Sequence, residues 1–368
     1  MKALNLNKFI VAGFAFAGLA LAPELRAQTG IFIEGGSASQ NVLYDRATNF
    51  FTANGGTLTS VTGGGSKTVS RFQGNAGGAL AALNPITIDI NVANGAVAGL
   101  QALSTQTAGP GDTNVLGDEV VPVLVDSAAT PDAIGNIDGS HFAAPLPTFV
   151  VPLVYIKNAS STDTAAITNL TQRQAVSLET SSPLQAAYYG GASTNKVYFV
   201  GRNTQAAVRT EIDLNINNTA AINTYSNFNG QAVLDTSADP GLSSGGAVTT
   251  AVLALTNSIG TIAVQNLKSG VTPLAYEGIP YSVTNVINGA YPLWGYENYY
   301  YIATGHSYAG APSDAQLAVI NAFYNLVTNA TFQATSPTFV GNFIPTAALK
   351  VKRDADGGQI TPIGSNFQ

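Results

Sequence analysis

Residues 30–39 have the sequence GIFIEGGSAS, in which a short apolar run enters a glycine turn that is followed by serines. Further apolar residues then recur at the spacing of one helix face, at Val42, Leu43, Ala47, Phe50 and Phe51. Because serine is favoured at helix N-termini, this stretch predicts a strand, a turn and a Ser-capped helix. That order opens an α/β unit, and the free N–H groups at the start of its helix suit an anion.

Strands and helices alternate along the rest of the chain. Strands are expected over 58–61, 120–125, 149–156, 196–202 and 259–264, and helices over 170–178, 247–255 and 314–327. A second glycine turn with hydroxyl side chains follows the first of these strands. The polar tail from Lys350 is expected to be mobile. The alternation predicts a mixed α/β protein.

The composition excludes several classes of protein. The chain has 368 residues, enough for one large or two medium domains, and 45% of them are hydrophobic, which rules out charge-driven disorder. Fifteen basic and 21 acidic residues give a net charge of −6, so nothing draws the chain to nucleic acid. Cysteine is absent, which excludes disulfides, thiolate chemistry and a lipid-bearing N-terminal cysteine. We expect no metal and no cofactor, because histidine occurs only at His141 and His306.

The N-terminus has the three parts of a secretory signal peptide. Lys2 and Lys8 precede an uncharged apolar run over 9–22, which is shorter than the ~20 residues of a membrane span, and a short polar region ends at Ala27. We expect cleavage after Ala27, so that residues 1–27 are removed; an uncleaved anchor or a buried helix is the alternative. The mature chain is then expected to be periplasmic or secreted, neither lipid-anchored nor membrane-spanning.

Several segments, in order, match one family. The most specific covers 276–293, with the sequence YEGIPYSVTNVINGAYPL. It resembles the G-x-x-P-T-x-x-N-I-x-x-G-x-Y-P-L segment of the phosphate-binding subunits of phosphate ABC importers, which are type 2 periplasmic binding proteins. Shorter segments that resemble the same family occur at 31–39, 63–66, 148–155, 169–171, 200–204, 244–246 and 257–262.

The resemblance implies a two-lobed α/β fold. Mixed sheets flanked by helices would form two lobes around a hinge, with the ligand in the cleft between them. Lobe 1 would comprise residues 28–150 and 270–368, and lobe 2 residues 151–269. The protein would be a monomer that performs no chemistry, captures phosphate or a related small oxyanion, and passes it to an ABC permease.

The resemblance also implies a set of anion donors. Ser37, Ala38 and Ser39 stand at the first helix start, where the family presents hydroxyl and N–H groups. Ser66 stands in the second glycine turn, and Arg202 stands where the family has an arginine after a strand. Charge-assisted hydrogen bonds from such groups suit an oxyanion.

Two departures from the family concern its polar ligands. A Gly-Ser-Gly-Thr-like turn follows the family's arginine, whereas this chain has Gln205 and Ala206, which leave only backbone N–H groups. The family's Ser-Asp pair falls on the segment with Asp126 and Ser127; one register places Ala129 at the aspartate, and a shift brings Asp126 near. Each lost donor costs about 1–3 kcal/mol of binding.

These departures keep other interpretations open. A non-transport extracellular or structural descendant of the fold, with a degenerate site, is the main alternative. In that case Ser37 and Ser39 only cap a helix, and Arg202 pairs with Glu211 or Asp213. The aromatic residues at 296–301 are expected to pack rather than to stack on a sugar. A hydrolase using His306 and Ser307 ranks lowest, because no acid is placed beside them.

Overall fold

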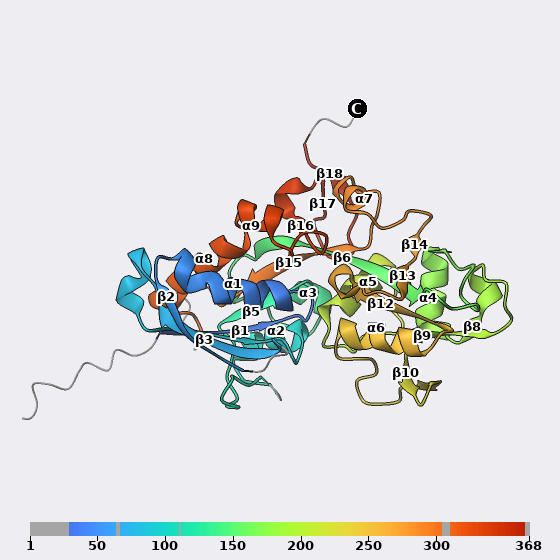
Figure 1. The fold of residues 1–368 in the computed structure, drawn as a ribbon, viewed down its shortest axis with the longest axis horizontal. Helices are drawn as coiled ribbons and strands as arrows, with labels where there is room; N and C mark the ends of the chain where they lie inside the picture. The colour runs from blue at the N-terminus through green and yellow to red at the C-terminus, as the bar shows by residue number, and fades with distance from the viewer. Residues whose placement is uncertain (1–28, 64–66, 110–111, 304–309, 365–368) are drawn as a thin grey trace, which may run out of the picture.

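The computed structural model describes residues 29–63, 67–109, 112–303 and 310–364. The predicted signal peptide lies outside the described residues. The described part is a mixed α/β fold with helices packed around a long sheet (Figure 1), which confirms the predicted class.

One long sheet runs through the molecule. Its described strands are β1 (Thr29–Gly35), β2 (Thr57–Thr62), β3 (Val69–Asn75), β4 (Ile86–Asn91), β5 (Leu124–Ser127), β6 (Leu146–Asn158), β8 (Leu184–Gln185), β9 (Lys196–Val200), β12 (Ser258–Ala263), β13 (Val271–Pro273), β15 (Trp294–Tyr300) and β16 (Ile344–Pro345). They follow the order β2-β3-β4-β1-β5-β15-β6-β12-β9-β8, and β13 and β16 also pair with β6. Three small pairs complete the described strands: β7 (Asn169–Leu170) with β14 (Ala275–Tyr276), β10 (Tyr225–Phe228) with β11 (Gln231–Leu234), and β17 (Val351–Lys352) with β18 (Thr361–Pro362).

Strand β6 joins the two halves of the sheet. Residues 146–152 pair with β15, whereas residues 153–157 pair with β12. The strand is buried along nearly its whole length, as its continuous apolar sequence requires. The lobe boundaries at 150 and 270 stay a prediction, but β6 changes partners close to the first of them.

Helices cover the sheet at both ends. They are α1 (Gln40–Ala53), α2 (Ala96–Thr105), α3 (Pro131–Ile134), α4 (Gln172–Ser181), α5 (Ala207–Asn215), α6 (Gly245–Ala254), α7 (Val283–Ile287), α8 (Asp314–Val327) and α9 (Ala330–Thr335), with 3₁₀ turns at Gly78–Leu83, Ala186–Tyr189, Val264–Asn266 and Thr346–Ala348. In Figure 1, α1, α2 and α8 lie with β1 to β5, whereas α4 and α6 lie with β9 and β12. None of the described helices is both long enough and apolar enough to cross a membrane.

Local signals account for most helix starts. Thr171 and Ser313 form capping boxes at α4 and α8, and Ser244 accepts a hydrogen bond from the Ala247 N–H. The predicted strand over 120–125 is wrong in extent, because ladder pairing begins only at Leu124. Pro122, two residues earlier, has no N–H to donate.

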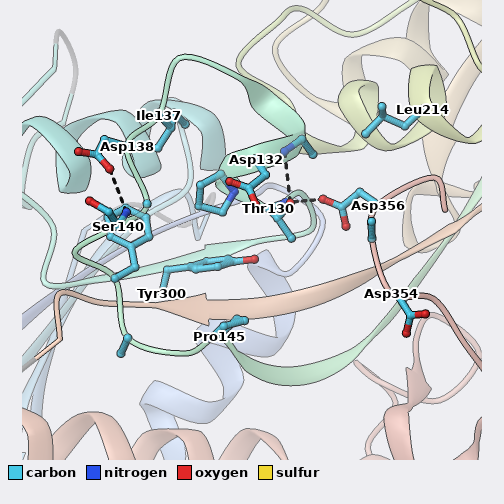
Figure 2. Close-up of a pocket in the computed structure, with 16 residues that line it drawn as sticks. Thr130, Asp132, Ile137, Asp138, Ser140, Pro145, Leu214, Tyr300, Asp354 and Asp356 are labelled. Atoms are coloured by element: carbon cyan, nitrogen blue, oxygen red, sulfur yellow. Dashed lines mark hydrogen bonds between the residues drawn. The ribbon is translucent and has the colours of Figure 1, made fainter.

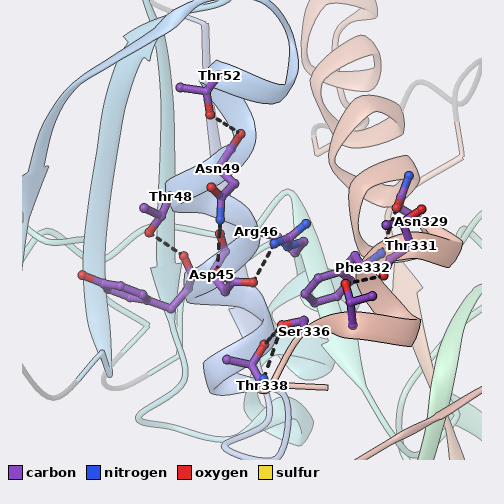
Figure 3. A network of polar contacts seen from close by, with 12 residues as sticks. Asp45, Arg46, Thr48, Asn49, Thr52, Asn329, Thr331, Phe332, Ser336 and Thr338 are labelled. Carbon is purple, nitrogen blue, oxygen red and sulfur yellow. Dashed lines mark hydrogen bonds and ion pairs between the residues drawn. The ribbon is translucent and has the colours of Figure 1, made fainter. Parts of the chain in front are cut away.

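Arg46 of α1 packs against Phe332 of α9, and polar contacts within each helix surround this pair (Figure 3). The Arg46 guanidinium carbon lies 3.6 Å from the centre of the Phe332 ring, and its Nη2 lies 2.6 Å from an Asp45 carboxylate oxygen. Asn329 caps α9 by accepting the Phe332 N–H at 3.0 Å. Because Asp45 lies on the same helix as Arg46, the largely buried Arg46 joins the two helices through its contact with the Phe332 ring.

The prediction of a mobile tail is wrong for residues 351–364, which the structure describes. β17 pairs with β18, and Arg353 turns inward, where it is 9% exposed. Its guanidinium carbon lies 4.4 Å from the centre of the Trp294 ring, and it donates to the carbonyls of Trp294 and Pro292 and to Asn215. The tail is therefore anchored by one buried cation that periodicity does not detect.

We expect Arg353→Ala to lower the free energy of unfolding by about 2–4 kcal/mol, because it removes several buried hydrogen bonds and a cation–π contact at once. Lys352→Ala is the matched control, since the Lys352 side chain is 52% exposed and pairs only with exposed Asp354. Urea unfolding of both variants measures the difference. Equal, small losses would show that the tail does not depend on Arg353.

Candidate anion-binding site

Three helix N-termini meet at a small cavity between the two halves of the fold. The cavity measures about 10 Å³ and is lined by Gly36, Ser37, Ala38, Gly95, Ala96, Ala128, Arg202, Ala206, Ala207, Val208 and Glu297. These residues include the starts of α2 and α5 and the turn that leads into α1, and no side chain caps any of the three helices. The first N–H groups of a helix have no partner within it and carry partial positive charge. The lining therefore offers several donors at one point.

Arg202 brings a full positive charge to this cavity. It follows β9, is 3% exposed, and donates through Nε to the Leu242 carbonyl at 3.0 Å and through Nη2 to the Ser243 carbonyl at 2.8 Å. Burial lowers its pKa to about 10, so the guanidinium stays charged at neutral pH. Among the described residues, no carboxylate lies within ion-pair distance of it.

The structure excludes the carboxylate partners considered for Arg202. Asp213 pairs with Arg209 of α5 and not with Arg202, with 3.6 Å between the Arg209 Nε and the carboxylate oxygen. Glu211 is fully buried on the same helix, where burial first and the nearby Asp356 second raise its pKa well above the usual range. The buried charge of Arg202 is balanced only by carbonyl dipoles, which is an expensive arrangement unless an anion completes it.

Glu297 adds a carboxyl group that the sequence interpretation missed. It lies on β15, lines the cavity, is 1% exposed, and neither of its oxygens has a hydrogen bond of good geometry. Burial first, and then the neighbouring Asp126, raises the pKa of Glu297 well above its usual range. This shift favours the protonated form of Glu297, and a protonated carboxyl can donate a hydrogen bond to an anion.

Asp126 stands behind Glu297 on β5. It is completely buried, and burial raises its pKa to about 7. Neither of its oxygens makes a hydrogen bond of good geometry, although Ser39 and Glu297 lie near enough to lower its pKa in part. Two adjacent buried carboxyls cannot both ionise readily, so the pair keeps at least one proton near neutral pH.

Four of the predicted site residues line the cavity itself: Ser37, Ala38, Arg202 and Ala206. The Ser37 hydroxyl is buried without a hydrogen-bond partner, so it is available as a donor. The Ser37 backbone carbonyl accepts a hydrogen bond at 2.7 Å from the side-chain Nε2 of Gln265, which lies in the other half of the fold.

The other predicted residues lie around the cavity. The Ser39 hydroxyl donates to the Gly36 carbonyl at 3.0 Å and does not cap α1, which corrects the expected serine cap. The Ser127 hydroxyl, at the end of β5, donates to the Ala129 carbonyl at 2.9 Å. Gln205 lies in the adjoining cleft. Ser66 lies outside the described residues.

Gly95 allows the halves to approach closely. Its φ is +90°, and a Cβ at this position would lie 2.3 Å from the Gln205 carbonyl oxygen. The same carbonyl accepts the Val97 N–H at 3.3 Å. A side chain at residue 95 would therefore push the start of α2 away from Gln205.

The described residues hold no group of three or more His, Cys, Asp or Glu side chains that could bind a metal ion. His306 and Ser307, considered above for hydrolysis, lie outside them. Arg202, Ser37 and the adjoining helix starts supply hydrogen-bond donors among small apolar residues, and the arrangement suits a small anion.

No protein-family model and no curated protein matches the sequence. Solved structures do match the fold. One, from Clostridium perfringens, is assigned as a phosphate ABC transporter substrate-binding protein and contains bound phosphate; it is 13% identical, with a TM-score of 0.57, over 86% of this chain and 100% of its own. An ABC-type phosphate transport receptor from Vibrio cholerae is 13% identical, with a TM-score of 0.53, over 85% of this chain and 99% of its own. The predicted two-lobed periplasmic-binding-protein fold is confirmed, while identity this low supports the fold alone.

Proposed function

We propose that the chain is an exported solute-binding protein that captures phosphate or a related small oxyanion at Arg202 and delivers it to an ABC permease. The observation that carries the proposal is a buried arginine without a carboxylate partner that faces three uncapped helix N-termini. Each helix start is equivalent to about half a positive charge. A bound anion would balance this positive potential, whereas a cation or an apolar ligand would not.

The donor set favours an anion with several oxygens. Arg202, the Ser37 hydroxyl and the carboxyl of Glu297 line the cavity from different elements, and the starts of α2 and α5 lie beside them. Hydrogen bonds to a charged acceptor contribute about 1.5–3 kcal/mol each. Because Glu297 can donate its own proton, the anion need not be protonated, so sulfate-like ions are candidates along with phosphate.

Capture would depend on movement of the two lobes. The cavity of about 10 Å³ is close to the space that one water molecule needs, so a tetrahedral oxyanion would enter when the lobes separate. Ser37 belongs to the α1 side and Arg202 to the β9 side, and closure would bring both onto the ligand. Hinge closure around a ligand is the usual device in two-lobed binding proteins.

Calorimetric titration of the mature chain with phosphate, and separately with sulfate, tests the proposal. We expect saturable binding at one site and a rise in melting temperature that grows with the anion concentration. Sodium chloride at the same ionic strength controls for general salt effects. No heat and no thermal shift with either anion at millimolar concentration would contradict the oxyanion assignment.

A specific observation supports a second candidate function. Ala38, Ala128, Ala206 and Val208 place methyl groups, not hydroxyls, around the cavity. A non-transport extracellular or structural descendant of the fold would tolerate this loss. That function predicts a well-folded protein that binds neither anion in the titration above.

A further inference from the structure

A groove of about 750 Å³ lies apart from the cavity at Arg202, and its lining shares no residue with that cavity (Figure 2). One wall follows α3, and the other is the segment between β17 and β18. Its chemistry is set by Asp132, Asp138, Asp354, Asp356, Phe142 and Tyr300. The size falls within the range of small-molecule sites, about 300–1,000 Å³.

Four carboxylates line the groove, and its lining includes neither lysine nor arginine. Asp356 accepts the Thr130 N–H at 2.6 Å, and Asp138 accepts the Ser140 N–H at 2.9 Å, so backbone bonds fix both side chains (Figure 2). The contacts with Ser140 lower the pKa of Asp138, which keeps it ionised. The acidic lining therefore carries an excess of negative charge.

The neighbouring cations balance only part of this charge. Lys352 pairs with Asp354 at 3.0 Å, and both side chains are more than half exposed. His141 lies 4.0 Å from Asp138 and is positive only when protonated. Exposed pairs of this kind contribute little. Asp132 and Asp356 take part in no ion pair among the described residues, although Arg353 lies near enough for Asp356 to raise its pKa in part.

Tyr300 forms a polar point in the floor of the groove. It is 2% exposed, and its hydroxyl has no hydrogen-bond partner of good geometry, although Asn298 lies near enough to lower its pKa in part. Figure 2 shows this hydroxyl directed toward Thr130 and Asp356. Its ring lies 6.2 Å from the Phe142 ring, centre to centre. A buried hydroxyl needs a partner, and aromatic faces attract cations.

We propose that this groove binds a linear organic polyamine, with ammonium groups on the aspartates and Tyr300 and methylene groups on the apolar walls. Ile137, Pro145 and Leu214 supply those walls. An organic cation fits better than a metal ion, because the described carboxylates form no cluster that could ligate one. The inference is independent of the oxyanion at Arg202.

Titration of the mature chain with spermidine tests the inference. We expect binding at one site, weakened about tenfold or more by Asp356→Asn and severalfold by Tyr300→Phe, since the first removes a charge and the second an acceptor. Asp356→Asn keeps an oxygen for the Thr130 N–H. Asp138→Asn, at a side chain 64% exposed, provides a charge-removing variant that leaves the buried structure untouched. Glu119→Gln, at an exposed acid outside the groove, is the matched control.

Three outcomes would overturn the polyamine site. They are no spermidine binding at millimolar concentration, an equal loss in Glu119→Gln, and binding of a lysine-rich peptide in place of spermidine. Phosphate titration of the same variants separates the two sites. We expect the phosphate affinity of Asp138→Asn to equal that of the unmodified chain, whether or not its spermidine affinity changes.

Discussion

Replacing Arg202 with alanine is expected to weaken oxyanion binding by about 100-fold to 1,000-fold, or about 3–4 kcal/mol. The guanidinium is the only full positive charge among the residues that line the described cavity, and it is almost completely buried. Its loss removes charge-assisted hydrogen bonds in a place where water screens little. Titration calorimetry with phosphate and sulfate measures the change.

Arg209→Ala is the matched control for this experiment. Arg209 lies on α5 and carries the same charge, but it pairs with Asp213 and does not line the cavity. We expect its removal to change oxyanion affinity less than about threefold, through weak long-range electrostatics. Arg202→Lys keeps the charge but loses the planar set of guanidinium donors. We expect its oxyanion affinity to lie between those of Arg202→Ala and Arg209→Ala. If Arg202→Ala and Arg209→Ala lose affinity equally, the site is not at Arg202.

Oxyanion affinity is also expected to fall as the pH rises above about 7, by up to about tenfold for each pH unit. Burial raises the pKa of Asp126 to about 7 and raises the pKa of Glu297 well above its usual range, so acid favours the protonated form of both. Above the pKa of Asp126 the pair acquires negative charge beside the anion. Binding the anion favours the protonated pair, and the affinity therefore decreases as that proton is lost.

Sulfate is the probe for this prediction, because its own charge stays at −2 across the range. Asp126→Asn removes the carboxyl whose pKa is about 7, so we expect the sulfate affinity of this variant to depend less on pH around neutrality than that of the unmodified chain. Glu297→Gln keeps a donor at the cavity and is expected to bind sulfate at pH 8 better than the unmodified chain does. An affinity that rises with pH in the unmodified chain would contradict the neutral-carboxyl account.

Local sequence signals predict much of the fold. Capping residues and apolar periodicity identify α4, α6 and α8, and the apolar run over 149–156 identifies the core of β6. Local signals do not identify β3 and β4, because β4 is defined by its pairing with β1 and β3 by its pairing with β4. The position of Arg353 likewise depends on Trp294, which is distant in sequence.

Part of the candidate site could likewise be predicted from the sequence, and part could not. Ser37 follows a strand and a glycine turn, which indicates a helix start, whereas Arg202 is selected through the resemblance to the phosphate-binding family. Glu297 lies within an aromatic strand, where the pattern indicates packing and hides a buried carboxyl. A single acid among large apolar residues is the one signal that could have identified it. Which hydroxyls face the cavity could not be predicted, because that depends on how two halves meet.

A crystal structure of the mature chain with arsenate tests the central claim most directly. Arsenate has the charge and shape of phosphate, and its arsenic can be located by anomalous scattering. The account predicts one strong peak bonded to Arg202 and Ser37, beside the starts of α1 and α5 and the carboxyl of Glu297. An arsenate-saturated crystal with no peak in this cavity, or with its peak elsewhere, would contradict an oxyanion site at Arg202.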